Sequence, residues 1–472
     1  MQNKPRLSFW QIFNMSFGFL GIQFGWGLQL GNMSGIYEKL GAKPDELPLL
    51  WLAAPLTGLI IQPIVGAMSD RTWNRFGRRR PYFLVGAILS SLALFIMPTS
   101  GTLWMAAGLL WVLDSSINIT MEPFRAFVAD KLNDEQRTTG FVTQSFFIGL
   151  GASLAGWLPL VFRNFGVTGE TTGGIPLTIK YAFQLGAVAF LLAVLYTVFT
   201  TKEYPPENME EFLAKKKASG GLINVIGEIV AEIREALGDL LKTMLQLAPV
   251  QIFTWLALFC MWLFYVPAVA RHVFGATDPK SEAYTRGQEF GGSTFAYMNI
   301  VCFAIAFLIP VAARKIGRKA THAFCLLCGA TGLLSVYFIS NPNFLIGSMC
   351  LIGVAWASIL SMPYAILSGS LPAARMGVYM GVFNFFIVIP EIVQALTFGP
   401  IIRTLFGTDN PNSSLYMVIA GGFFMLLAAA LTLLLVKDAP AAGETVPTRA
   451  DEDAKFTVRQ SAQPVPSSGL VE

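Results

Sequence analysis

The stretch WVLDSSINITMEPFRAFVAD, from Trp111 to Asp130, governs how the rest of the chain is interpreted. Its apolar pattern is long enough for a membrane-spanning helix, yet it contains Asp114, Asn118, Glu122 and Arg125. At about 100° per residue these four positions share one helix face. An ionisable side chain near the bilayer centre costs at least ~2.5 kcal/mol, so we expect this face to line a polar path inside a helix bundle.

The composition of the whole chain predicts an integral membrane protein. Of its 472 residues, 54% are hydrophobic and only 13% are charged, which leaves too few polar side chains to cover a soluble protein. A window of about 20 residues locates twelve candidate spans. They lie at about 9–31, 47–68, 81–97, 103–129, 140–161, 180–200, 250–271, 291–313, 320–340, 344–368, 376–400 and 414–436.

Four regions follow from these spans. Residues 1–200 form a first six-helix bundle and residues 249–436 a second. Between them, residues 201–248 form a linker with an amphipathic helix, INVIGEIVAEIREALGDLLKTML, on the cytoplasmic membrane surface. The polar tail 437–472 lacks a core-forming pattern, so we expect it to be disordered. Most Lys and Arg residues fall in loops on the side of the N-terminus, which places both termini in the cytoplasm.

An internal repeat relates the two bundles. RFGRR at 75–79 recurs 240 residues later as KIGRK at 315–319, and the Pro-aromatic pair at 123–124 recurs at 363–364. Two parallel repeats predict an all-α fold of twelve transmembrane helices in two pseudo-symmetric bundles, with a binding site between them near mid-membrane. At the same offset Asp114 is matched by Val354, so the ionisable chemistry belongs to the first half.

Several separated motifs carry a family resemblance. GAMSDRTWNRFGRRRP at 66–81 resembles the loop 2–3 signature of the major facilitator superfamily. Together with GIQFGWGLQL at 21–30, LDSSINITMEPFRAFVAD at 113–130 and VIPEIVQ at 388–394, it resembles the sucrose–proton symporters and bacterial maltose and sucrose relatives of the glycoside–pentoside–hexuronide cation symporter group. The resemblance implies a monomeric, proton-coupled importer of a disaccharide in the bacterial inner membrane, with no enzymatic activity and no cofactor beyond H⁺.

The resemblance also assigns roles to individual residues. The family's membrane aspartate matches Asp114, which implies a proton carrier that also binds sugar hydroxyls. The family's arginine after the proline matches Arg125. An acidic and basic group near the eighth span is partly kept, as Arg286 and Glu289, whereas the aspartates of the plant members' seventh span are absent here.

The physical case for Asp114 is independent of the family. Loss of hydration disfavours a charged carboxylate, so a buried Asp can be neutral when loaded and charged when empty. The alternative is a structural aspartate hydrogen-bonded in the bundle core. Arg125 lies about 16 Å further along the helix, too far for a direct pair with Asp114, and a structural pair with Glu122 is the alternative to a role in substrate binding or gating.

Sugar recognition requires apolar ring faces and hydrogen-bonding groups for hydroxyls. For any one amide, a hydrogen bond between helices is an alternative to ligand contact. The predicted substrate-binding residues, spread over five spans, are Asp114, Asn118, Arg125, Gln23, Trp26, Gln29, Gln144, Asn299, Asn384 and Glu391.

Charged residues near the cytoplasmic side predict a gate, or alternatively only the orientation of the chain in the membrane. They are Asp70, Arg71, Gly77 and Arg78, together with Glu122 and Arg137. Metal binding by Cys325 and Cys328 is not expected, since they lie in an apolar span without further ligands. No GxxxxGK[ST] loop for ATP occurs, and the small net charge of +4 gives no indication of nucleic-acid binding. A sodium-coupled carrier, an uncoupled facilitator and a non-transporting sugar sensor remain open.

Overall fold

The computed structural model describes residues 5–205, 209, 210, 212, 227, 231, 242–368, 376–407 and 410–437. Most of these residues are helical, and β pairing among them is limited to two isolated bridges, Asn74 with Gly77 and Glu170 with Pro176. Except for its last residues, Lys242 to Leu245, and isolated helical residues, the predicted amphipathic linker helix lies outside the described residues. The predicted disordered tail lies outside them beyond Lys437.

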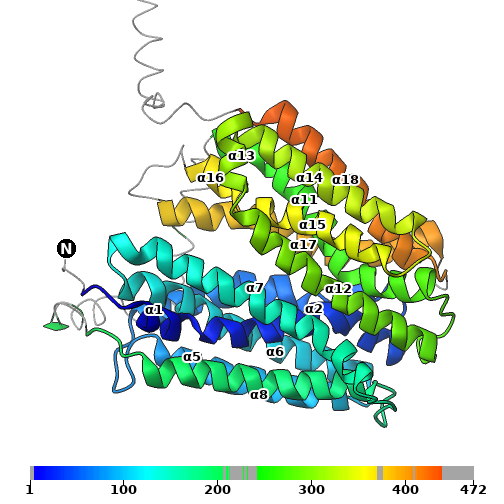
Figure 1. The fold of residues 1–472 in the computed structure, drawn as a ribbon, viewed down its shortest axis with the longest axis horizontal. Helices are drawn as coiled ribbons and strands as arrows, with labels where there is room; N and C mark the ends of the chain where they lie inside the picture. The colour runs from blue at the N-terminus through cyan, green and yellow to red at the C-terminus, as the bar shows by residue number, and fades with distance from the viewer. Residues whose placement is uncertain are drawn as a thin grey trace, which may run out of the picture.

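The helices form two stacked bundles, one from each half of the chain, with both described ends of the chain on the same side (Figure 1). The first half contains α1 Phe9–Ser16, α2 Gly18–Lys39, α3 Leu47–Leu50, α4 Ala53–Asp70, α5 Arg80–Ile96, η1 Met97–Thr99, α6 Leu103–Lys131, α7 Asp134–Asn164 and α8 Leu177–Thr200. The second contains α11 Lys242–Ala268, η2 Val269–Val273, α12 Glu282–Ala306, α13 Ile309–Ile316, α14 Arg318–Ser335, η3 Val336–Phe338, α15 Phe344–Ile359, α16 Met362–Ser368, α17 Met376–Phe406 and α18 Ser413–Leu435.

Twelve membrane-length helical segments are present in the described parts of the chain. Ten helices are long and apolar enough to cross a bilayer, and α12 with α13, bent by 53°, makes an eleventh. The twelfth is α2, whose 22 residues include several Gly, Gln and charged side chains that lower its apolar character. The predicted fold of twelve helices in two six-helix bundles is therefore confirmed.

Polar caps fix where several of these helices begin. The Thr102 side chain accepts a hydrogen bond from the backbone N–H of Met105 at the start of α6. Ser281 does the same at the start of α12 through the N–H of Tyr284. Each cap satisfies one of the backbone donors that the first turn of a helix leaves unpaired. The long polar face of α6 is therefore positioned by a defined helix start.

The backbone carries the internal repeat that the sequence predicted. Gly77 and Gly317, which are 240 residues apart, both have positive φ, +109° and +86°. The helix after each ends in a short 3₁₀ turn, α5 with η1 in the first half and α14 with η3 in the second. A positive φ is costly for any residue with a Cβ, which explains why glycine is kept at both turns.

The first and eighth spans extend beyond their predicted bounds. The first span was predicted to end at residue 31, but α2 continues to Lys39. The eighth was predicted to begin at residue 291, but α12 already starts at Glu282. The added turns contain buried charges, among them Glu38 and Glu289, and a hydropathy window treats such residues as solvated. Here they are paired between the halves, so the helices continue.

Glycines allow the two halves to approach closely at this boundary. A Cβ added to Gly31 of α2 would lie 3.5 Å from the Cα of Gly292 in α12. One turn on, a Cβ at Gly35 would collide with the Gln288 side chain at 2.4 Å. Small residues permit this contact of backbones, as in other membrane helix pairs.

Candidate functional site

Asp114 is the most deeply placed acidic residue of the first half. Its side chain is 0% exposed, near the middle of the span Leu103–Val128. Gln29 of α2 donates a hydrogen bond from Nε2 to Asp114 Oδ1 at 2.7 Å. Asp114 Oδ2 and Gln29 Oε1 are buried and have no hydrogen-bond partner in the described part of the chain. The pair therefore offers unused hydrogen-bonding capacity at mid-membrane, where such groups are normally satisfied.

Asn118, one turn along α6, is fully hydrogen-bonded. Its Nδ2 donates to the Asp114 carbonyl at 2.9 Å and to Thr57 Oγ1 at 3.2 Å. Its Oδ1 accepts from Gln62 Nε2 at 2.7 Å. Asn118 thus joins α6 to α4 and orients the helix turn that carries Asp114. The prediction that it binds substrate stays untested.

Glu122 and Arg125 lie nearer the end of α6 and are less enclosed. Glu122 is half-buried, Arg125 is exposed, and no ion pair joins them within this described stretch of α6. The structural pair considered for them is thus not formed. Arg125 is close enough to Tyr364 of the second half for the two side chains to interact electrostatically.

The predicted amide side chains and Trp26 differ in their burial and in their hydrogen bonds. Gln144 is buried and its Nε2 has no partner. Asn299 donates to the Phe295 carbonyl of its own helix at 2.9 Å, a bond that supports a structural role. Trp26 packs against the main hydrophobic core, and Gln23 lies against Gly151 of α7. Asn384 is half-buried.

Glu391 of α17 is the second acidic residue in a membrane core. It is 7% exposed and follows Pro390 within the helix. One turn on, Gln394 donates to Cys260 Sγ of α11 at 3.1 Å, while its Oε1 is unpaired. Glu391 itself has no hydrogen bond or ion pair to another described residue. Glu391 lies in the second half, whereas Asp114 and Gln29 lie in the first.

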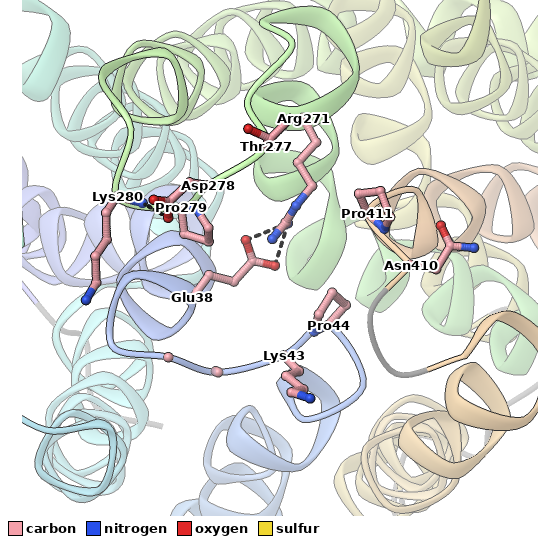
Figure 2. Close-up of a pocket in the computed structure, with 12 residues that line it drawn as sticks. Glu38, Lys43, Pro44, Arg271, Thr277, Asp278, Pro279, Lys280, Asn410 and Pro411 are labelled. Atoms are coloured by element: carbon pink, nitrogen blue, oxygen red, sulfur yellow. Dashed lines mark hydrogen bonds and ion pairs between the residues drawn. The ribbon is translucent and has the colours of Figure 1, made fainter.

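Charged side chains bind the two halves together at the end of the bundle opposite the chain termini, here called the distal face. Arg271 of η2 donates from Nη1 to both carboxylate oxygens of Glu38, at 2.8 and 2.6 Å (Figure 2). Tyr284 of α12 also donates to Glu38, and Lys39 donates to Thr285 Oγ1 at 2.8 Å. Glu38 and Lys39 are fully enclosed by these contacts.

A second set of distal contacts involves α7 and α17. Arg163 at the end of α7 forms an ion pair with Glu289 and another with Glu282, the latter at 2.7 Å. Asp45, which precedes α3, accepts from Arg403 of α17 at 2.8 and 3.0 Å. Ion pairs that cross from half to half at several places hold the distal face closed.

A cavity of about 310 Å³ lies above the Glu38 and Arg271 pair. Figure 2 shows that its walls come from the loop after α2, from the loop before α12 and from the residues just before α18. Lys43, Asp278 and Lys280 line it. Glu38 and Arg271 themselves belong to the lining, and Asp114 does not.

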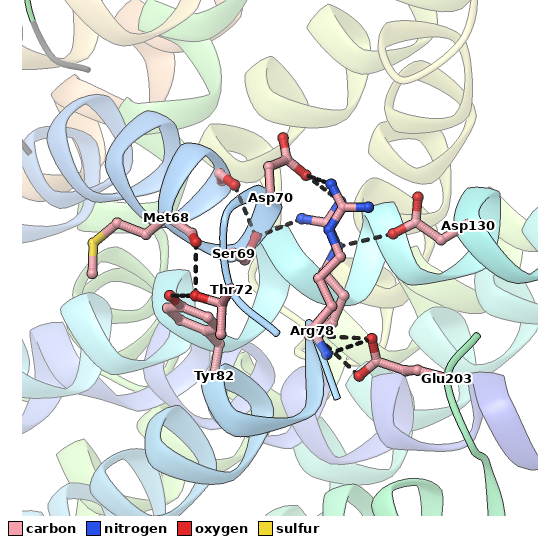
Figure 3. A network of polar contacts seen from close by, with 10 residues as sticks. Met68, Ser69, Asp70, Thr72, Arg78, Tyr82, Asp130 and Glu203 are labelled. Atoms are coloured by element: carbon pink, nitrogen blue, oxygen red, sulfur yellow. Dashed lines mark hydrogen bonds and ion pairs between the residues drawn. The ribbon is translucent and has the colours of Figure 1, made fainter. Parts of the chain in front are cut away.

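The predicted gate residues form a network within the first half (Figure 3). Arg78 and Arg79 both donate to Asp70 Oδ1, at 2.7 and 2.5 Å, and Arg79 also pairs with Asp130 at 2.9 Å. The Glu203 carboxylate accepts backbone N–H groups of residues 78 to 80 at 2.8 to 3.0 Å. A gate role is untested, since these contacts join elements of a single half.

The remaining gate residues are placed as follows. Arg71 caps the end of α4 through its backbone N–H and has further contacts. Gly77 makes the turn, and a Cβ there would meet a Glu203 carboxylate oxygen at 2.6 Å. Arg137 lies in α7, and its side chain is outside the described part of the structure. These assignments as gate residues stay predictions.

Sequence reasoning missed two groups that the fold brings together. Gln62 was overlooked although it is an amide in an apolar span, the same signal that indicated Gln29 and Gln144. Glu38 and Arg271 were missed because a charge at a helix end is usually solvated, and only the packing of the halves encloses this pair. The mid-membrane Asp114 and Gln29 were both predicted, and the structure brings them into contact.

Comparisons with known proteins agree with this architecture. The sequence is 25% identical over 462 residues to the sucrose transport protein SUC4 of Arabidopsis thaliana, covering 88% of each chain. It is 27% identical over 476 residues to the sucrose transport protein SUT1 of Oryza sativa subsp. japonica, covering 88% of this chain and 86% of the relative.

Solved structures match the fold at lower identity. A nucleoside transporter NupG variant superposes with a TM-score of 0.68 at 14% identity, covering 91% of this chain and 99% of its own. A D-xylose-proton symporter superposes with a TM-score of 0.63 at 17% identity, covering 93% and 100%. The family profile of the Major Facilitator Superfamily matches residues 15–395. This chain, with two six-helix halves meeting at a closed distal face, therefore belongs to the Major Facilitator Superfamily of membrane transporters.

Proposed function

We propose that this protein is a proton-coupled symporter that imports a disaccharide, namely sucrose, maltose or a related glucoside, by alternating access. Asp114 is the residue that carries the proton. The observation that supports this most directly is the unpaired Oδ2 of a fully buried carboxyl group whose other oxygen is held by Gln29. A protonated carboxyl group can donate to a sugar hydroxyl, whereas a carboxylate can only accept.

The coupling follows from the cost of the buried charge. An empty site with a charged, desolvated Asp114 is unfavourable, and protonation removes that cost. Sugar hydroxyls that bond to Oδ2 and to Gln29 Oε1 stabilise the loaded state further. A site that prefers to be loaded with both partners or with neither moves the two together.

Alternating access requires one face to open as the other closes. The distal ion pairs, such as Glu38 with Arg271, support a conformation in which the distal face is closed. Their rupture opens the distal face to sugar and protons. The Asp70 and Arg78 network and Arg125 belong to the opposite face, where we place the second gate.

Sugar specificity is proposed from the relatives, which are named as sucrose transport proteins. The amides Gln29 and Gln144 supply bonds to hydroxyls, and Glu391 and Asn384 supply further contacts from the second half. We propose that the protein works as a monomer in the bacterial cytoplasmic membrane with both termini in the cytoplasm. The Lys and Arg distribution among its loops supports that orientation.

Proteoliposomes test this function. Purified protein is reconstituted, and uptake of labelled sucrose and labelled maltose is followed with an inward proton gradient, an inward Na⁺ gradient or neither. We expect accumulation above the external concentration with the proton gradient alone. Accumulation driven by Na⁺ would establish a sodium-coupled carrier, and equilibration without accumulation would establish a facilitator. If neither labelled sugar enters the vesicles under any gradient, and neither exchanges with unlabelled sugar inside them, a non-transporting sensor is favoured.

A further inference from the structure

Three tryptophan rings meet in the membrane core of the second half. Trp255 and Trp262 lie on α11, and Trp356 lies on α15. The ring centroids are 6.1 Å apart between Trp255 and Trp262, 5.9 Å between Trp255 and Trp356, and 5.8 Å between Trp262 and Trp356. Trp356 meets both other rings edge to face, at 76° and 89°. The three rings therefore form a triangle of aromatic faces and edges.

Polar atoms beside these rings lack partners. The indole N–H groups of Trp255 and Trp262 are buried and donate no hydrogen bond to any residue that the structure describes. Gln251, one turn before Trp255 on α11, is 0% exposed, and both its amide atoms are unpaired. Each unpaired buried group costs about 1–3 kcal/mol. Gln251, Trp255 and Trp262 fall within about 40° of one another around the α11 axis, so they share one helix face. A packing cluster alone leaves this cost unexplained, whereas a polar ligand removes it.

The group lies at the same depth as Asp114. Trp255 is near the middle of the span Lys242–Val273, and Trp356 is at the middle of Phe344–Leu367. In its most apolar window α11 is 72% buried, the largest share among the candidate spans of the described residues. It packs directly on α2, the helix that carries Gln29. The three rings are only half-buried although their helix is central.

We propose that Trp255, Trp262 and Trp356, with Gln251, form a subsite for one sugar ring. The aromatic faces bind the C–H surface of a pyranose, while the Gln251 amide and the indole N–H groups bond to its hydroxyls. The subsite has no ionisable side chain, so it suits a neutral ring. With Asp114 and Gln29 binding the other ring, it selects a disaccharide over a monosaccharide. This inference rests on the proposed function and specifies its substrate class.

The test compares ring-keeping and ring-removing substitutions in reconstituted protein. Trp262→Leu and Trp356→Leu remove a ring, Trp262→Phe and Trp356→Phe keep one, and Trp104→Leu alters a tryptophan that is 77% exposed on α6. Exchange of labelled sucrose, maltose and methyl glucoside is measured for KM and maximal rate. Thermal unfolding without sugar shows whether each variant is folded.

We expect each Leu substitution to raise the disaccharide KM at least about tenfold, which corresponds to ~1.4 kcal/mol of lost binding, with the maximal rate nearly kept. Trp356→Phe should stay within about threefold of wild type, whereas Trp262→Phe, which keeps a ring but loses the indole N–H, should fall between wild type and Trp262→Leu. The preference for disaccharide over methyl glucoside should disappear in the Leu variants and persist in Trp104→Leu.

Three results would overturn the subsite in different ways. If wild-type protein exchanges disaccharide and folded Leu variants keep its KM and its sugar preference, the rings are packing residues and the proposed function stands. If only the maximal rate falls, the rings act on the conformational change and bind no sugar. If wild-type protein exchanges none of the sugars, the proposed function fails and the subsite fails with it.

Discussion

The two halves share a backbone repeat but differ in chemistry at the same depth. In the first half, Asp114 and Gln29 present a carboxyl group and an amide with unpaired atoms. In the second, Val354 occupies the position that corresponds to Asp114, and rings such as Trp356 take over the membrane core. A charge that changes in one half can thus be coupled to a neutral ligand held by both. The comparison teaches that pseudo-symmetry of the fold does not require symmetry of the site.

The two faces of the bundle differ as well. At the distal face, ion pairs such as Glu38 with Arg271 join one half to the other. At the opposite face, Asp70 and Arg78 are joined within the first half. Contacts between halves hold one conformation of the transporter, whereas contacts inside a half move with it as a rigid unit.

The largest effect should follow from neutralising the first half. Asp114→Asn removes the ionisable group and keeps the shape and an acceptor for Gln29. We expect the internal-to-external sugar ratio under a proton gradient to fall to about one, because sugar and proton are no longer linked. Exchange of labelled sugar at equal concentrations should persist in the same proteoliposomes. Accumulation at the wild-type level would contradict the assignment.

A large effect is also expected at the distal contact between the halves. Arg271→Gln leaves Glu38 buried without its ion pair, which destabilises the distal-closed conformation by about 3–5 kcal/mol. In a background lacking the native cysteines, Ser34→Cys, at a position 2% exposed in α2, should then react faster with an impermeant maleimide added from the distal side.

The double variant Glu38→Gln with Arg271→Gln serves as the control for this experiment. Removing both charges is far less costly than removing one, so labelling of the cysteine should return toward the wild-type rate. Equal labelling in all three proteins would show that the pair does not hold the distal face closed.

A smaller effect should appear in the turn network of the first half. Gly77→Ala forces a Cβ to within 2.6 Å of the Glu203 carboxylate at a φ of +109°. Gly41→Ala is the matched control, since its φ is +99° and nothing lies within 4 Å of its added Cβ. Both carry backbone strain of roughly 1–2 kcal/mol, and only Gly77→Ala should lower the unfolding temperature further. Equal temperatures would argue against a role for Glu203.

The smallest effect is expected at Glu391, the acidic residue of the second half. Glu391→Gln keeps hydrogen-bonding capacity and removes the cost of a desolvated carboxylate. We expect proton-driven accumulation to remain, the sugar KM to change by less than about threefold, and the unfolding temperature to stay equal or rise. A loss of accumulation like that of Asp114→Asn would show that both halves handle the proton.

The sequence predicted the fold and part of the site for reasons that can be traced. Long apolar runs predicted the spans, and the RFGRR and KIGRK motifs with the two Pro-aromatic pairs predicted the repeat. A carboxyl group in an apolar stretch identified Asp114. That Gln29 bonds to it depends on how α2 packs on α6, which no local pattern encodes.

Other features of the site could not be predicted, because their residues match common sequence patterns. In the sequence, tryptophans such as Trp262 are typical of core or lipid-facing positions. Only the structure shows that the buried indole N–H groups of Trp255 and Trp262 are unpaired among the described residues. The turns that contain Glu38 and Glu289 were excluded from the spans, because pairing across the halves cannot be recognised from hydropathy.

The central claim is that Asp114 couples sugar to a proton in the first half alone. Its most direct test is the movement of protons when sugar is added to proteoliposomes that hold a pH-sensitive dye and have no ion gradient. For wild-type protein and Glu391→Gln, sucrose or maltose should acidify the lumen, and for Asp114→Asn it should not. Sugar entry into wild-type vesicles without acidification, or acidification that persists in Asp114→Asn, would contradict the account.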